Sequence, residues 1–276
     1  MRHRYLALVP LLSTAIAFAE PTAEQLQTRK TELEQRLGKD GLHVMIEAPF
    51  VLVGDEAPKR FASRANFVQW VLRLIEKDYF AKRPDKVIEI WLFRNETTYR
   101  AGAKKYFDDE PDTPYGYYSS SDDALIMNIG PGAGTLSHEL VHPYIEANFP
   151  AAPSWFNEGL ASLYEQPREK EGHMWGTTNW RLPGLTSMIK AKSLPTLAAM
   201  LGTTSEEFYA ADYDAYAYAR FLCQYLQDHG VLREFYKKFS TNEKDKTGQL
   251  ALEAVVGMKL EDFQPVFNKW ALGLRR

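Results

Sequence analysis

The sequence predicts an α+β fold with a sheet-containing N-terminal lobe, a helical C-terminal lobe and a cleft where the two lobes meet. Two observations support this prediction. Short apolar runs bounded by turn residues recur between residues 43 and 129. After Gly134 the signals are almost wholly helical.

Residues 1–19 have the pattern of a secretory signal peptide. Two arginines precede an apolar run over residues 5–18, and small residues at 17 and 19 predict cleavage after Ala19. A buried first helix is the alternative. The run is too short for a membrane span, and no later segment reaches 18 uninterrupted apolar residues. We therefore expect a secreted or periplasmic protein with no membrane span after signal removal.

Charge and cysteine content exclude several classes of function. The formal net charge is −3, and loss of residues 1–19 removes two arginines and no acids, which leaves −5 (−3 − 2). This charge does not favour binding to nucleic acid or to anionic membranes. Cys223 is the single cysteine, so an intramolecular disulfide is excluded. Its apolar neighbours favour a buried thiol over a nucleophile, which disfavours a cysteine hydrolase.

The elements expected before Gly134 follow the chain in order. Residues 24–36 are charged and predict a solvated helix, within an N-terminal helical segment over residues 20–40. An amphipathic helix is expected over residues 58–80, and a further helix over residues 96–106. Strands are expected over residues 43–47, 50–53, 87–93, 115–118 and 124–129, of which the last two suggest a hairpin.

An HExxH motif lies near the start of a predicted helix, after the glycine-containing residues 130–134. Residues four apart on an α-helix point the same way, so His138 and His142 can bind one metal ion. Glu139, offset by one residue, is aimed at a water molecule in the site and is the expected catalytic base. Catalytic zinc typically has three protein ligands, so a third ligand is expected on a nearby element.

Glu158 is the expected third ligand. It follows His142 after fifteen intervening residues, in the first full turn of a second predicted helix that Ser154 can cap. A short loop joins the two helices, so they face each other. The Glu158 carboxylate can then reach an ion bound by the first helix.

Together these two segments resemble the gluzincin metallopeptidases. The stretch from Trp155 to Ser162 is similar to the Asn-Glu-Gly-Phe-Ala stretch of the aminopeptidase N family, and the order of elements looks closer to the peptidase MA-like domain of many bacterial proteins. The resemblance implies a zincin-like metallopeptidase domain over residues 41–276, with an α+β lobe at 41–133, a helical lobe at 134–276 and Zn²⁺ in the cleft between them. The substrate implied is a peptide or protein.

The resemblance also implies a tyrosine that hydrogen-bonds the oxyanion of the tetrahedral intermediate. Tyr216 is the expected residue, because it opens a segment that resembles the family helix carrying this tyrosine. Tyr213 and Tyr218 are near enough to be rivals, and core packing is the alternative role for Tyr216.

Two positions depart from the family pattern. Pro143 lacks the N–H that would bond the Glu139 carbonyl, so we expect a kink that both histidines precede. Ser162 stands where thermolysin-like gluzincins have an aspartate that orients a histidine. Glu165 is a candidate substitute, and a solvated acid on a helix is the alternative.

The signals for substrate access are less specific. The chain lacks the Gly-x-Met-Glu-Asn strand with which aminopeptidases of that family capture a substrate amino terminus, so exopeptidase action is unsupported and an endopeptidase is expected. The edge of the 124–129 strand can pair with an extended peptide, or it is an ordinary sheet edge. His173, Trp175 and Trp180 can border a substrate cleft, but loop packing is favoured for them.

The expected function is peptide-bond hydrolysis by a secreted zinc metallopeptidase. Zinc polarises the scissile carbonyl and acidifies water, while Glu139 takes a proton and passes it to the leaving amine. One alternative is an inactive zincin-fold envelope protein that binds peptide or glycan, although the presence of Glu139 speaks against it. The other is a zinc hydrolase of a non-peptide amide, which substrate profiling would separate.

Overall fold

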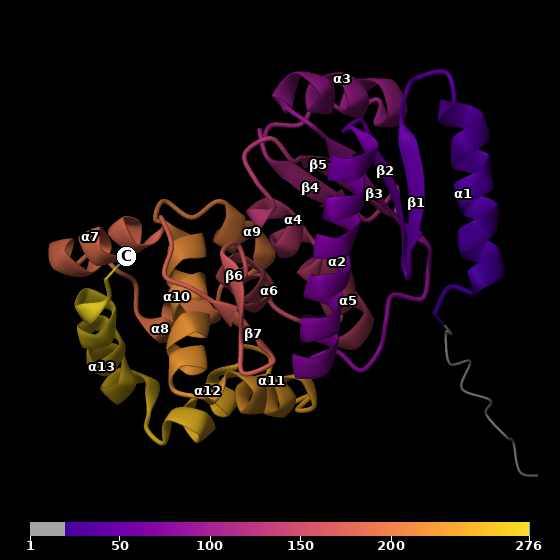
Figure 1. Cartoon of the computed structure of the whole chain (residues 1–276). Helices are drawn as coiled ribbons and strands as arrows, with labels where there is room; N and C mark the ends of the chain where they lie inside the picture. Colours follow the sequence, from indigo (N-terminus) through magenta and orange to yellow (C-terminus); the bar gives the residue numbers. More distant parts are fainter. Residues whose placement is uncertain (1–19, 276) are drawn as a thin grey trace, which may run out of the picture.

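The computed structural model describes residues 20–275, and the expected signal peptide over residues 1–19 lies outside this range. The described part of the chain has the predicted α+β fold, with a mixed five-stranded sheet in its N-terminal half and helices in its C-terminal half (Figure 1). Within that range, no helix combines the length and the hydrophobicity that a membrane crossing requires.

The five strands predicted for the N-terminal half are all present. They are β1 (His43–Glu47), β2 (Phe50–Gly54), β3 (Ile88–Phe93), β4 (Gly116–Ser119) and β5 (Ala124–Asn128). Their order in the sheet is β1-β2-β3-β5-β4. The strands β2, β3 and β5 are parallel, whereas β1 and β4 run antiparallel to their neighbours at the two edges. The expectation that the 124–129 strand is an edge is wrong, because β4 pairs with β5 and forms the edge itself.

Helices cover both faces of the sheet (Figure 1). On one face lie α1 (Ala23–Leu37) and α3 (Glu96–Phe107), whereas α2 (Pro58–Asp78) and α4 (Gly134–Glu139) contribute to the core on the other. Within β3, Leu92 belongs to the α2 core and Trp91 to the core under α1 and α3. Burial on both faces explains why the sequence of β3 is almost wholly apolar.

The C-terminal half is helical apart from one hairpin. Its helices are α5 (Val141–Asn148), α6 (Ser154–Leu163), α7 (Leu182–Ala191), α8 (Leu197–Leu201), α9 (Ser205–Tyr209), α10 (Ala215–Asp228), α11 (Leu232–Ser240), α12 (Gln249–Val256) and α13 (Leu260–Gly273). The almost wholly helical prediction missed an antiparallel pair, β6 (Pro167–Lys170) and β7 (His173–Gly176). Glu169 in β6 accepts hydrogen bonds from Trp70 at 3.0 Å and Arg73 at 2.7 Å, which tie the hairpin to α2.

Helix α6 packs closely against α10 at Gly159. A Cβ atom at this position would lie 2.9 Å from the carbonyl oxygen of Ala219 and 3.1 Å from Sγ of Cys223, so a side chain there would have to displace α10. Cys223 is buried, as the sequence predicted. Because Glu158 precedes Gly159 directly, this helix contact sets where the Glu158 backbone lies.

We expect Gly159→Ala to destabilise the fold. Overpacking of a well-packed core costs about 1–3 kcal/mol, more than the roughly 1 kcal/mol that alanine gains over glycine within a helix. Gly273→Ala in α13 is the matched control, because no described atom lies within 4 Å of a Cβ built there. Urea unfolding of both variants measures the difference. Equal stability of the two would contradict a tight contact between α6 and α10.

Candidate metal centre

The HExxH segment forms two short helices rather than one. Helices α4 and α5 are separated at Leu140, in the turn where Pro143 has no N–H to offer the carbonyl of Glu139. The expectation that both histidines precede the break is wrong, because the break falls between His138 and His142. Their imidazole rings still lie close together, with centroids 5.0 Å apart.

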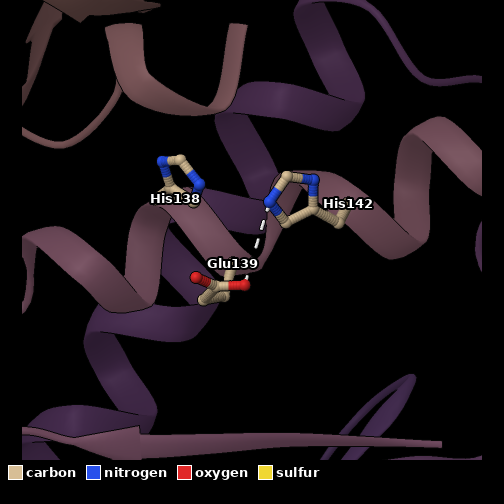
Figure 2. A group of neighbouring side chains, drawn as sticks. All are labelled: His138, Glu139 and His142. Carbon is tan, nitrogen blue, oxygen red and sulfur yellow. Dashed lines mark ion pairs between the residues drawn. The ribbon is translucent and has the colours of Figure 1, made fainter. Parts of the chain in front are cut away.

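His138, Glu139 and His142 form a group that can hold a metal ion. The three residues offer ligand atoms that all lie within 4.8 Å of one another (Figure 2). Nδ1 of His142 lies 2.8 Å from Oδ1 of Asn157, which favours the tautomer that carries its proton on Nδ1. Nε2 of His142, which is 3.8 Å from a Glu139 oxygen, then has a free lone pair for a metal.

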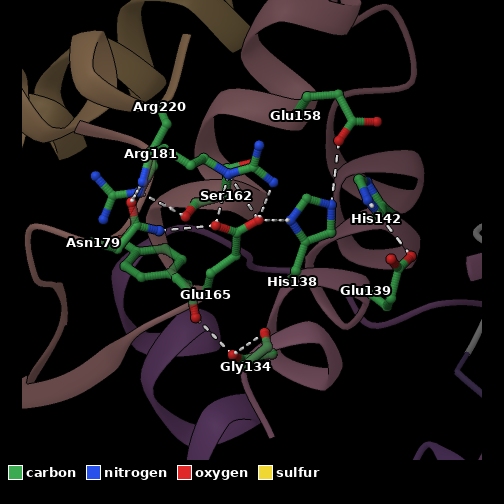
Figure 3. Close-up of polar contacts among 12 residues, drawn as sticks. Gly134, His138, Glu139, His142, Glu158, Ser162, Glu165, Asn179, Arg181 and Arg220 are labelled. Carbon is green, nitrogen blue, oxygen red and sulfur yellow. Dashed lines mark hydrogen bonds and ion pairs between the residues drawn. The ribbon is translucent and has the colours of Figure 1, made fainter. Parts of the chain in front are cut away.

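Glu158 in α6 adds a carboxylate beside His138. Its Oε2 atom lies 3.2 Å from Nε2 of His138 and is buried, yet it has no well-formed hydrogen bond among the described residues (Figure 3). Its Oε1 atom accepts a hydrogen bond of 2.8 Å from the Tyr209 hydroxyl. Leaving a buried carboxylate oxygen unpaired is unfavourable, and a cation at this point would satisfy it. The donor set therefore fits a metal ion.

The helix that carries Glu158 begins differently from the prediction. Ser154 is its first residue, and no side chain caps it at the preceding Pro153. The Ser154 hydroxyl instead donates a hydrogen bond of 2.8 Å to Ser205 at the start of α9. Ser154 therefore joins α6 to α9 and does not cap α6, although the position of Glu158 one turn later is as expected.

The carboxyl groups of Glu139 and Glu158 ionise differently. Burial raises the pKa of Glu139 to about 7, an effect that His142 opposes and Glu158 adds to. Burial alone would raise the pKa of Glu158 as well, but its contact with His138 and its closeness to His142 lower that pKa to about 2. Glu158 is thus anionic, as a metal ligand must be, whereas Glu139 can exchange a proton near neutral pH.

The edge strand β4 lies directly beside this group. The backbone of Tyr118 in β4 lies close enough to the Glu139 carboxylate to lower the pKa of that group. The Tyr118 hydroxyl donates to a carboxylate oxygen of Glu146 in α5 at 3.0 Å. Backbone and side chain of the same strand residue therefore contact the helices that carry the two histidines.

Glu165 is buried next to His138, so the alternative of a solvated acid is wrong. Its Oε1 atom lies 3.6 Å from Nδ1 of His138 (Figure 3). Arg181 donates to both oxygens of the Glu165 carboxylate, at 2.6 and 2.9 Å, and Asn179 donates to it at 2.9 Å. Ser162 is buried, and its hydroxyl has no partner within residues 20–275. The carboxylate beside Nδ1 of His138 is therefore that of Glu165.

Of the three tyrosines considered for the oxyanion, Tyr216 lines the cleft and the other two do not. Tyr213 borders a separate hollow, and the Tyr218 hydroxyl donates to the carbonyl oxygen of Pro195 at 3.2 Å. Burial, and after it the charge of Glu158, raises the pKa of Tyr216 above its usual value. Its phenol therefore stays protonated and can donate a hydrogen bond.

Tyr209 is a site residue that the sequence did not indicate. It ends the short helix α9, lines the cleft and hydrogen-bonds Glu158. Its ring centroid lies 6.4 Å from that of Tyr216. No motif surrounds Tyr209, and it meets Glu158 only because α9 packs against α6. The sequence alone therefore contains no signal that distinguishes Tyr209 from the other tyrosines.

These groups share one cleft of about 1100 Å³, which is lined by residues of the sheet lobe and of the helical lobe. Trp180 lines it, contrary to the loop packing favoured for this residue. His173 and Trp175 do not line it, but they lie in strand β7 and not in the loop that the sequence predicted. His173 pairs with Asp78 at 2.5 Å, and the Lys170 ammonium lies 4.0 Å from the centre of the Trp175 ring.

No protein-family model matches this chain, and no curated protein is significantly similar to it. The assignment of a function therefore depends on the fold and on the residues of the site.

We expect the protein to bind one divalent metal ion per chain, and we expect His138→Ala and His142→Ala each to abolish tight binding. Glu158→Ala should weaken binding strongly, because three protein ligands are the usual minimum for a catalytic site. Glu139→Gln should retain the ion. Competition with a chelating dye measures each affinity.

Glu146→Gln is the control for this series, because Glu146 lines the same cleft outside the metal-binding group. A Glu158→Ala variant that binds the metal as tightly as the parent, together with a weakened Glu139→Gln, would identify Glu139 as the third ligand instead.

Proposed function

We propose that the protein is a zinc metallopeptidase that cleaves extended peptides at internal bonds. The observation that carries this proposal is the group of His138, Glu139 and His142 beside the unsatisfied oxygen of Glu158, in a cleft bordered by an edge strand. The resemblance of these segments to gluzincin metallopeptidases supports the same reading.

His138, His142 and Glu158 would hold the ion. Two imidazoles and one carboxylate are an established ligand set for catalytic zinc, and they leave one coordination position open. Bound zinc supplies a Lewis acid that polarises a carbonyl group and acidifies water. The anionic state of Glu158 and the Nδ1-protonated tautomer of His142 both favour such binding.

Glu139 is the proposed general base. It accepts a proton from the attacking water and delivers that proton to the leaving nitrogen as the peptide bond breaks. A pKa of about 7 suits both transfers near neutral pH.

Tyr216 is the proposed donor to the oxyanion. A protonated phenol aimed into the cleft can stabilise the negative charge that develops on the carbonyl oxygen during attack. The guanidinium carbon of Arg181 lies 5.2 Å from the centre of the Tyr216 ring, a cation–π contact that holds the ring in place.

The edge strand β4 supports a peptide as the substrate. Its outer side presents backbone groups that are not paired with β5, and an extended peptide can pair with such an edge as an added strand. Gly116, Tyr117 and Tyr118 line the cleft, so a peptide bound there passes the metal-binding group. The signal-like residues 1–19 support action outside the cytoplasm.

We expect Glu139→Gln to retain metal and fold but to lose peptide hydrolysis, because a neutral amide cannot accept a proton from water. The contribution of a general base predicts a loss of about 100- to 10,000-fold. Hydrolysis of a quenched fluorescent peptide library, measured with metal content on the same samples, provides the test. A zinc-loaded wild type that cleaves no peptide in a broad library would refute the proposed function.

We expect Tyr216→Phe to lower kcat about a hundredfold or more, while KM and metal affinity stay close to the parent values. The hydroxyl acts on charge that exists only as the reaction proceeds, so its removal affects turnover rather than ground-state binding. Steady-state kinetics on a cleaved library peptide separates the two constants.

Two further tyrosine variants locate the oxyanion donor. Tyr213→Phe is the control and should leave kcat unchanged, because Tyr213 lies outside the cleft. Tyr209→Phe removes the hydrogen bond to Glu158 and should weaken metal binding instead. If kcat falls in Tyr209→Phe with full metal occupancy while Tyr216→Phe is unaffected, the oxyanion role belongs to Tyr209.

A further inference from the structure

Exposed aromatic side chains at the cleft indicate which substrates it accepts. Within residues 20–275 three large aromatic side chains stand out by their exposure: Tyr115 at 52%, Trp180 at 48% and Tyr209 at 55%. All three line the cleft that holds the metal-binding group. Exposed aromatic surface gathered in a concave site is typical of ligand binding. We refer to these three residues as the rim aromatics.

The rim aromatics belong to both lobes and adjoin the proposed catalytic residues. Tyr115 precedes the edge strand β4, whereas Trp180 follows β7 and Tyr209 ends α9. Tyr209 hydrogen-bonds a proposed metal ligand. Trp180 is followed directly by Arg181, whose guanidinium lies over the Tyr216 ring. A substrate that spans the cleft near the metal-binding group therefore meets aromatic surface from both lobes.

The charges that line the cleft are mainly negative. Carboxylates come from Glu139, Glu146, Glu158 and Glu165, and the lining residues include a single lysine or arginine, Arg181. The Arg181 guanidinium is already paired with the Glu165 carboxylate through two hydrogen bonds. The divalent ion that the proposed function places here offsets two of these negative charges, so the charged side chains do not by themselves select among substrates.

We propose that the cleft selects extended polypeptide segments with an aromatic residue close to the scissile bond. This inference rests on the proposed peptidase function. Aromatic side chains of the substrate stack on the rim aromatics and remove apolar surface from water on both partners. The edge strand β4 favours a peptide over a glycan, because its free backbone groups match those of an extended chain.

Peptide binding to zinc-loaded Glu139→Gln tests this selectivity without requiring turnover. The probes are three fluorescein-labelled peptides that are identical and uncharged except for a central Phe, Ala or Glu. Fluorescence anisotropy should show that the Phe peptide binds roughly three- to tenfold more tightly than the Ala peptide, the scale of one aromatic contact. The Glu peptide, which also lacks an aromatic ring at this position, should likewise bind more weakly than the Phe peptide. Equal affinities for the three peptides would overturn the inference.

Variants at Trp180 test whether the rim supplies the preference. In the same background, Trp180→Ala should bind the Phe and Ala peptides about equally, and Trp180→Phe should restore most of the difference. Trp175→Ala is the matched control, because it removes a tryptophan that does not line the cleft. An unchanged preference in folded Trp180→Ala would overturn the inference. Binding of a chitin-derived oligosaccharide with no binding of any peptide would overturn it as well, in favour of a glycan.

Cleavage of the same three peptides by the wild-type zinc protein separates this inference from the proposed function. Selective binding of the Phe peptide with no cleavage of any peptide would support the aromatic preference and refute the proposed hydrolysis. Cleavage of all three peptides at equal rates would support the proposed hydrolysis and overturn the aromatic preference.

Discussion

The position of α6 depends on one contact at its middle and one just beyond its C-terminal end, and the candidate metal centre depends on α6. Gly159 allows α6 to lie directly on α10, and the Ser137 hydroxyl of α4 donates a hydrogen bond of 2.6 Å to the carbonyl group just after α6. With α6 fixed in this way, Glu158 lies next to Nε2 of His138 and Glu165 lies next to Nδ1 of the same ring (Figure 3). The orientation of this imidazole is therefore a product of helix packing as well as of the motif.

Local patterns predicted the sheet lobe well and long-range contacts poorly. The strands were recognisable because covered faces demand apolar side chains, as in β3. Strand order has no such local signature, which is why β5 was mistaken for an edge. The β6–β7 hairpin escaped prediction because β6 is charged and exposed, and because it is tied to α2 by a contact between Glu169 and Trp70 that is remote in sequence.

In the candidate site, too, local features could be predicted from the sequence and contacts between distant segments could not. The spacing of His138 and His142 is a local helical property, so it could be read directly, even though the helix breaks between them. The location of Glu158 followed from a short connection between helices. Tyr209 and the buried partners of Glu165 could not be predicted, because each reaches the site through the packing of elements that are separated in sequence.

The proposed metal ligands and the rim aromatics are encoded in separate stretches of the chain. The ligand-bearing elements occupy the continuous segment from α4 to α6, whereas Tyr115, Trp180 and Tyr209 are carried by three segments outside it. Changes in the segments of Tyr115 and Trp180 can therefore alter what the cleft binds without altering the proposed metal ligands. Gene duplicates of such a protein can diverge in what they bind through a few substitutions in these two segments.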